Sequence, residues 1–391
     1  MLSIIKNRIK NSKYLSYIYF SAMKAILKII LIVTPVEPQT VLFSSFSGRQ
    51  FSDSPRAVFN ALDKDPRFSG YHLVWAKTKN LNNELFPCKS VDIDSFKFLF
   101  MLARAKYWVS NASIERLTPV NHSNHIYIQT WHGVPLKHLG KDEPNLKYLI
   151  KNWYKNVRFD LLTASSTYDA RIFSKIFPNS AEAIQSVGLP RNAEMLDLAT
   201  DSQLIHREII EELDLDPTKK ILLFAPTFRE FEEDQNGFER LNTKLSKNML
   251  HHLREQYNFL VRGHYFTSST NHGSEDYIDV TEFADLNKLL VAADILITDY
   301  SSIMFDFSLL SKPILLFIPD IETYLHIRGV YLDPRNLGLP YTTNETDLTC
   351  LLSSLDSTQE SQNIRQFSHR FSGTDPHKSL EVIKEKILET S

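Results

Sequence analysis

Cysteine is almost absent from this sequence, and its scarcity excludes two classes of site. Of 391 residues only Cys88 and Cys350 are cysteines, and they lie far apart without the close spacing of a metal-binding pair. A disulfide scaffold and a cysteine-ligated zinc are therefore excluded, and the pattern is typical of a reducing compartment. The motifs His-x-His and His-Glu-x-x-His are also absent, so we expect no metal site.

Two phosphate-binding fingerprints are missing as well. The chain has no Gly-x-x-x-x-Gly-Lys-Ser/Thr loop and no Gly-x-Gly-x-x-Gly turn, which argues against a P-loop enzyme and a nicotinamide dehydrogenase. The net charge of −2 argues against a general nucleic-acid binder. We therefore expect no cofactor and no nucleic-acid partner. The 43% hydrophobic content excludes a disordered chain, and the length favours two domains.

Acidic residues are absent from positions 1–36, which form a basic and apolar segment. Its six basic residues are Lys6, Arg8, Lys10, Lys13, Lys24 and Lys28. The apolar and aromatic stretch 14–33 is long enough to span a bilayer, but it carries two lysines spaced four apart on one helix face. We favour a basic amphipathic helix lying in a membrane interface; a helix packed on the protein's own body and a true span are the alternatives. Pro35 and Pro38 end this helix.

From residue 40 onward, short apolar runs alternate with helical patterns, which indicates parallel sheets built from βαβ units. The first half has strand signals at 41–46, 71–76, 107–110, 126–129, 161–164 and 184–187, and helical signals at 55–62 and 95–104. A charged helix and connector at 201–220 leads to a second set of strands at 221–224, 259–262, 277–279, 295–298 and 314–317. Two such halves predict two facing Rossmann-like domains with a cleft between them.

Ligands of open α/β sheets bind outside the carboxyl ends of the strands, so the residues that follow each strand are the candidates. His132 and Gly133 follow the strand at 126–129, and Lys137 comes soon after. A histidine has the pKa suited to proton transfer near neutrality, the glycine allows close backbone approach, and the lysine could meet a phosphate. A strand-end histidine held by a backbone carbonyl is the structural alternative.

The second half repeats this arrangement. His264 and Gly263 follow the strand at 259–262, whose last residue Arg262 could bind phosphate oxygens. Thr227 and Arg229 follow the strand at 221–224. Asp299, Ser301 and Ser302 lie between the strand at 295–298 and a helix; they are either a helix cap or an anion cradle suited to a diphosphate.

Seven blocks of residues follow one another in order over residues 120–385. They are Gln-Thr-Trp-His-Gly-Val-Pro-Leu-Lys at 129–137, Gly-Leu-Pro-Arg-Asn at 188–192, Phe-Ala-Pro-Thr-Phe-Arg at 224–229, Arg-Gly-His-Tyr at 262–265, Thr-Asp-Tyr-Ser-Ser-Ile-Met-Phe-Asp-Phe at 298–307, Arg-Gly-Val-Tyr at 328–331, and the spaced residues Phe371, Asp375 and Ser379. Together they resemble the CDP-glycerol glycerophosphotransferases of teichoic-acid and capsule synthesis. Each block alone is weak, whereas the ordered set is highly specific.

The resemblance implies a GT-B-like fold that moves a polyol phosphate, most simply glycerol phosphate, from a CDP-linked donor with release of CMP. It implies His132 as general base and His264 as a second catalytic group. Donor phosphates would be bound by Thr227, Arg229, Arg262, Asp299, Ser301 and Ser302, and Gly133, Lys137, Arg191 and Asn192 would line the acceptor side or cleft. The family also implies a peripheral, monotopic protein at the cytoplasmic face of the membrane, with an undecaprenyl-diphosphate-linked saccharide as acceptor.

We accordingly expect a membrane-associating segment at 1–38, an acceptor-side domain at 39–205 and a donor-binding domain at 206–391. One alternative is a GT-B glycosyltransferase or sugar-phosphate capsule polymerase that uses another nucleotide-activated donor. A second is a non-catalytic membrane-bound partner that retains the fold.

Overall fold

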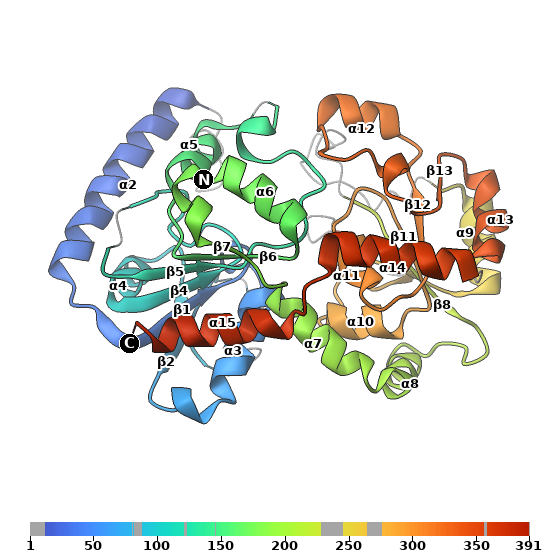
Figure 1. The fold of residues 1–391 in the computed structure, drawn as a ribbon, viewed down its shortest axis with the longest axis horizontal. Coiled ribbons are helices and arrows are strands. Elements are labelled where there is room, and N and C mark those ends of the chain that lie inside the picture. Colours follow the sequence, from blue (N-terminus) through green and yellow to red (C-terminus); the bar gives the residue numbers. More distant parts are fainter. Residues whose placement is uncertain are drawn as a thin grey trace. The chain divides into compact units, whose positions relative to one another are not determined.

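The computed structural model describes residues 12–79, 81, 88–120, 123–144, 146–227, 245–263, 276–355 and 358–390. The chain forms two compact units, each built around its own sheet (Figure 1). Unit 1 comprises residues 1–132, 139–193 and 374–391, and unit 2 comprises residues 133–138 and 194–373. The first unit thus ends at Ala193 rather than after residue 205, and residues 374–391 return to it instead of belonging to the second.

Among the described residues, the sheet of unit 1 has seven parallel strands in the order β3-β2-β1-β4-β5-β6-β7. Its strands are β1 (Glu37–Ser44), β2 (His72–Lys77), β3 (Lys89–Asp92), β4 (Ala105–Ser110), β5 (Ile126–Gln129), β6 (Leu161–Ala164) and β7 (Ile184–Ser186). The order of the strands reverses between β1 and β4, and this is where a Rossmann-like sheet binds its ligand.

The helices of unit 1 are α2 (Lys13–Val33), α3 (Asp53–Asp63), α4 (Phe96–Arg104), α5 (Tyr148–Asn156), α6 (Thr167–Ile176) and α15 (His377–Leu388). Close to the C-terminal end of the sequence, α15 packs against α3 and adds Ile383 and Ile387 to the core of unit 1. Helix α7 (Pro190–Ala199) begins in unit 1 and ends in unit 2.

The sheet of unit 2 has six parallel strands within the described ranges, in the order β10-β9-β8-β11-β12-β13. They are β8 (Ile221–Ala225), β9 (Asn258–Val261), β10 (Ile278–Asp279), β11 (Ile295–Thr298), β12 (Ile314–Phe317) and β13 (Tyr341–Thr342). Its helices are α8 (Ser202–Glu212), α9 (Lys247–Gln256), α10 (Leu286–Ala292), α11 (Ile303–Ser308), α12 (Ile321–Ile327), α13 (Leu348–Ser354) and α14 (Thr358–Ser372). The order of these strands reverses between β8 and β11, so unit 2 repeats the plan of unit 1.

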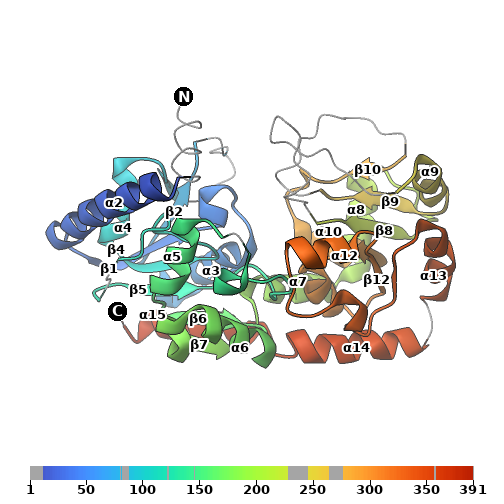
Figure 2. The ribbon, with the colours of Figure 1, turned by 90° about the horizontal axis from the view of Figure 1, so that it is seen from above.

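The N-terminal helix α2 covers part of unit 1 with a narrow buried stripe. Ser12 caps its start by accepting a hydrogen bond from the backbone N–H of Leu15, and the helix ends just before Pro35. It packs on α4 and α5 (Figures 1 and 2). Its buried residues are Ser16, Leu27 and Ile30. Most of its remaining apolar surface is exposed, and its basic residues Lys24 and Lys28 also face solvent.

Candidate active site

His132 lies in a bend immediately after β5, in unit 1. The bend depends on Trp131, whose φ of 52° places it in the left-handed region and whose backbone N–H donates to the Gln129 side chain. The Trp131 ring is buried against Phe173 and Phe177, and this anchors the backbone next to the histidine. His132 is therefore attached to an anchored segment at the carboxyl end of β5.

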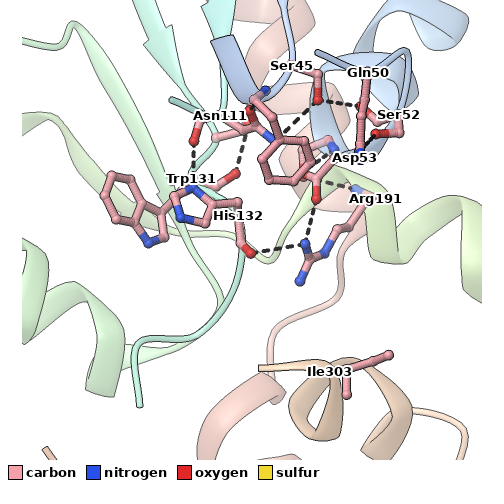
Figure 3. A network of polar contacts seen from close by, with 12 residues as sticks. Ser45, Gln50, Ser52, Asp53, Asn111, Trp131, His132, Arg191 and Ile303 are labelled. Atoms are coloured by element: carbon pink, nitrogen blue, oxygen red, sulfur yellow. Dashed lines mark hydrogen bonds and ion pairs between the residues drawn. The ribbon is translucent and has the colours of Figure 1, made fainter. Parts of the chain in front are cut away.

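One ring nitrogen of His132 is fixed by the backbone. Its Nδ1 lies 2.7 Å from the carbonyl oxygen of Asn111, the residue that follows β4 (Figure 3). Because a carbonyl only accepts hydrogen bonds, Nδ1 carries the proton and Nε2 carries the lone pair in the neutral ring. The ring is thus held in the tautomer that can accept a proton at Nε2.

Arg191 and Asp53 support the same bend (Figure 3). The Arg191 guanidinium donates to the backbone carbonyl of His132 at 3.1 Å and forms an ion pair with Asp53 at 2.6 Å. The backbone N–H of Arg191, near the start of α7, donates to the Ser54 hydroxyl at 3.3 Å. The first turns of α3 and α7 therefore meet beside His132.

The electrostatic environment keeps His132 neutral. Burial is the largest effect on the pKa of His132 and lowers it; the hydrogen bond to Asn111 and the charge of Asp53 act in the opposite direction, and Arg191 lowers it further. Burial by itself would raise the pKa of Asp53, but the charge and hydrogen bonds of Arg191 and the hydrogen bonds from Ser54 and Asn111 bring it below its usual range. The site thus combines a neutral imidazole with an ionised carboxylate.

In unit 2, Asp299 joins the ends of the two central strands. Its carboxylate accepts hydrogen bonds from the Thr227 hydroxyl at 2.6 Å and from the backbone N–H groups of Thr227 and Tyr300. Asp299 is buried. A carboxylate saturated in this way cannot bind a phosphate itself, so its effect is to hold Thr227 and the turn that follows β11 in place.

The two serines of that turn differ in their contacts. Ser301 accepts a hydrogen bond from the backbone N–H of Ile303 at 3.4 Å, whereas Ser302 precedes α11 without capping it through its side chain. Capping therefore does not account for Ser302. Helix α11 has only six residues, so the turn offers hydroxyl groups more than a strong helix dipole.

Arg262 and Lys137 are also in unit 2. The Arg262 guanidinium donates to the backbone carbonyls of Val280 and Phe283, at 2.8 and 2.9 Å. These bonds tie it to the loop after β10. Residues 133–138 belong to unit 2, where Lys137 forms a β-bridge with Val330 and its ammonium lies 5.8 Å from the centre of the Tyr324 ring.

Of the other predicted site residues, two lie within the described ranges and two lie outside them. Gly133 has a φ of 139°, and Asn192 is buried in the first turn of α7. Arg229 and His264 lie outside the described residues. Within the described residues, no group of three or more His, Cys, Asp or Glu side chains could hold a metal ion.

Comparison with protein families identifies the chain. The model of the family described as CDP-Glycerol:Poly(glycerophosphate) glycerophosphotransferase matches residues 26–389. The chain belongs to this family. The resemblance inferred from the seven motifs is thereby confirmed, as is the predicted enzyme class of CDP-glycerol glycerophosphotransferases.

Curated glycerophosphotransferases of this kind align with nearly the whole chain. The teichoic acid poly(glycerol phosphate) polymerase of Bacillus spizizenii is 32% identical over 377 residues, which are 92% of this chain and 94% of that protein. The teichoic acid glycerol-phosphate transferase of Staphylococcus aureus is 30% identical over 91% of this chain and 92% of its own length. The corresponding polymerase of Staphylococcus epidermidis is 32% identical over 90% of this chain, but the chain spans only 51% of that longer protein.

Solved structures confirm the GT-B-like fold. A variant of the wall teichoic acid polymerase TagF superposes with a TM-score of 0.81 at 29% identity, covering 98% of this chain and 97% of that one. Another variant, soaked with CDPG, also gives 0.81. A putative UDP-N-acetylglucosamine 2-epimerase from Listeria monocytogenes shares the fold alone, with a TM-score of 0.54 at 13% identity over 90% of this chain and 97% of that one.

Sequence reasoning missed Asn111 and Asp53. Asn111 directly follows β4, so the rule that selected His132 would also have selected it. Asp53 carries no such signal, because it lies several residues beyond β1 and resembles an ordinary residue of a helix N-terminus. Only the fold brings it to the histidine.

Proposed function

We propose that this chain transfers glycerol phosphate from CDP-glycerol to a hydroxyl group of a membrane-lipid-linked glycan and releases CMP, as a step in teichoic acid synthesis. The observation that supports this most directly is the neutral His132 ring, with Nδ1 fixed by Asn111 and Nε2 able to accept a proton. Membership of the glycerophosphotransferase family supplies the donor class.

In the proposed reaction, the acceptor hydroxyl attacks the β-phosphorus of CDP-glycerol in line with the bond to CMP. A phosphorus–oxygen bond to the acceptor forms while the bond to CMP breaks, and the hydroxyl proton moves to Nε2 of His132. CMP leaves with the electron pair of the broken bond. Donors aimed at the phosphates stabilise the charge that develops on the oxygen atoms.

We assign the donor phosphates to unit 2, at the point where its strand order reverses. Ser302 contributes a hydroxyl group there, whereas the Thr227 hydroxyl donates its proton to Asp299, so Thr227 is proposed to shape the site. Arg229 and His264 are proposed to bind the donor phosphates from their motifs. Arg262 is proposed to shape the site through the loop after β10, since its guanidinium donates to that loop.

The acceptor side is assigned to unit 1 around His132, with Gly133, Arg191 and Asn192 beside it. Lys137, which belongs to unit 2, is proposed as a phosphate-binding residue from its motif. A lipid-linked acceptor agrees with the exposed apolar face of α2. This helix of 21 residues is long and apolar enough to cross a membrane by length and composition, and only 17% of its most apolar stretch is buried. Because Lys24 and Lys28 interrupt the apolar stretch, we propose that α2 lies in the cytoplasmic interface without spanning it.

The decisive experiment incubates the purified chain with CDP-glycerol or CDP-ribitol and a short prenyl-diphosphate-linked saccharide. We expect CMP release with CDP-glycerol and a product heavier by one or more glycerol phosphate units, read by mass spectrometry. UDP-sugars serve as the comparison donors. Release of UDP with sugar transfer would favour the glycosyltransferase alternative, and failure to bind any CDP-polyol would favour the non-catalytic one.

A further inference from the structure

Asp53 is a buried carboxylate beside His132 that the proposed mechanism does not yet use. It is the first residue of α3, and its side chain is only 7% exposed. One carboxylate oxygen accepts a hydrogen bond from the backbone N–H of Ser54 at 2.6 Å, and the other accepts one from the Arg191 guanidinium at 2.6 Å. A charge buried this deeply is retained only with such partners.

Both groups that hold His132 also contact Asp53 (Figure 3). Arg191 donates to the His132 carbonyl and to the Asp53 carboxylate through the same nitrogen. Asn111 accepts from Nδ1 of His132 through its carbonyl, and its side chain hydrogen-bonds to Asp53. The backbone and the ring of His132 are therefore tied to a single carboxylate by two separate routes.

The backbone at Asp53 is in an uncommon conformation. Its φ is 62°, in the left-handed region that residues other than glycine rarely adopt, and Trp131 beside His132 has a φ of 52°. Such conformations persist where the surrounding contacts determine them strongly, and they gather at functional sites. In this conformation the Asp53 carboxylate contacts both Arg191 and Asn111.

We propose that Asp53 is a positioning residue for the transfer reaction: it fixes the orientation of His132 through Arg191 and Asn111, and its negative charge favours the imidazolium that forms when His132 accepts the proton. This inference rests on the proposed role of His132 as general base. It adds a residue from the first 110 positions, where the family motifs are weakest.

The charges around His132 make the inference testable through the direction in which the pKa of His132 shifts. In the described part of the chain, the charged groups that act on the ring are Asp53 of α3, which raises the pKa of His132, and Arg191 of α7, which lowers it. Removing the first should lower the pKa of His132, and removing the second should raise it. A residue that only stabilised the fold would not give opposite shifts from the two halves of one ion pair.

Asp53→Asn is the most informative variant. Asparagine has nearly the same shape and is one of the few residues that tolerates a left-handed backbone, so the substitution removes the charge with little change in conformation. Asp65→Asn is the matched control, because Asp65 forms an ion pair with Arg67 of the same 2.6 Å length in the same unit. Arg191→Gln tests the opposite sign.

The first measurement does not depend on activity. Diethyl pyrocarbonate modifies neutral imidazole, so the rate at which the peptide carrying His132 is modified, followed by mass spectrometry from pH 4.5 to 8, gives the pKa of His132 in the full-length protein. We expect a lower pKa in Asp53→Asn, a higher one in Arg191→Gln and the wild-type value in Asp65→Asn. An unchanged or raised pKa in Asp53→Asn would overturn the electrostatic role.

The second measurement is the pH profile of CMP release. In Asp53→Asn we expect the acid limb at lower pH and a plateau kcat reduced about tenfold or more, with little change in KM for CDP-glycerol, because the loss falls on the proton transfer. A wild-type kcat would overturn the positioning role.

If Asp53→Asn does not fold, as judged by circular dichroism, Arg191→Gln becomes the test. An unshifted pKa of His132 in Arg191→Gln would then overturn the proposal. If the wild-type chain releases no CMP, the proposed function fails while the modification experiment still decides the role of Asp53.

Discussion

At the scale of single residues, the site consists of side chains whose partners are largely backbone groups. His132 donates to a carbonyl, and the carboxylates of Asp53 and Asp299 each accept from backbone N–H groups. A backbone partner has no rotamers, so these hydrogen bonds restrict the orientation of His132, Asp53 and Asp299 before any substrate arrives. Such preorganised groups are effective because they need little rearrangement during the reaction.

Replacement of His132 by alanine is expected to reduce kcat by about 10²-fold or more, because the acceptor hydroxyl loses its proton acceptor. Wild-type activity should fall as the pH drops through the pKa of His132, which lies below the ordinary value of 6.5, and should be level near pH 7. Initial rates of CMP release from pH 5 to 8 measure both effects. Near-wild-type turnover by His132→Ala would rule out the assignment.

Replacement of Thr227 by valine tests the donor side. The substitution keeps the shape of the side chain and removes the hydroxyl that Asp299 holds at 2.6 Å. We expect a higher KM for CDP-glycerol and a lower kcat, while the pH at the acid limb stays at its wild-type value because His132 is untouched. Thr218→Val provides a control, since its hydroxyl is bonded to Asp216 in the connector before β8. Equal effects of the two substitutions would argue against a donor role for Thr227.

At the scale of elements, apolar strands were predicted well and polar features poorly. The strands at 126–129, 161–164, 295–298 and 314–317 are confirmed with the same bounds, because buried parallel strands read as uninterrupted apolar runs. Edge strands β3 and β13 were missed: β3 has no buried residue, and β13 has only two residues. Asn111 and Asp53 were not predicted for a related reason: the role of a buried polar residue depends on contacts with residues that are distant in sequence.

Helix α2 is expected to bind membranes through its exposed face. Ile29 and Ile32 are 61% and 73% exposed, so changing both to aspartate should sharply reduce sedimentation with vesicles of phosphatidylglycerol and phosphatidylcholine while leaving the melting temperature nearly unchanged. Leu27→Ala is the contrasting variant: its side chain is buried, so it should lower the free energy of unfolding by about 2–5 kcal/mol. Unaltered vesicle binding by the aspartate variant would exclude this face as the membrane contact.

At the scale of the whole molecule, the chain passes between the two units after His132, after His138, after Ala193 and after Gly373. The last passage returns α15 to unit 1, where Ile383 and Ile387 join the core and the Ile387 carbonyl accepts a hydrogen bond from Tyr107. Sequence patterns revealed the two sheets but not this return, because the amphipathic pattern of a helix does not say which sheet it covers. Which sheet α15 covers is known only from its packing contacts in the structure.

The return of α15 predicts that unit 1 depends on the other end of the chain. Ile383→Ala should lower the free energy of unfolding by about 2–5 kcal/mol, because it removes a fully buried side chain. Hydrogen exchange should then accelerate in β1 and β4 of unit 1 and remain slow in β8 and β11 of unit 2. Glu385→Ala, on the exposed side of the same helix, should change neither. Faster exchange in unit 2 alone would contradict the assignment of α15.

The position of α15 also has a consequence for the order in which the parts of unit 1 are synthesised. A ribosome that synthesises this chain releases the strands of unit 1 early, yet the helix that completes the core of unit 1 emerges only with residues 374–391. The segments of unit 2 all precede residue 374, and until α15 follows them unit 1 exposes the apolar surface that α15 covers. The strands of unit 1 are therefore synthesised first, but the core that contains them is completed by the segment synthesised last.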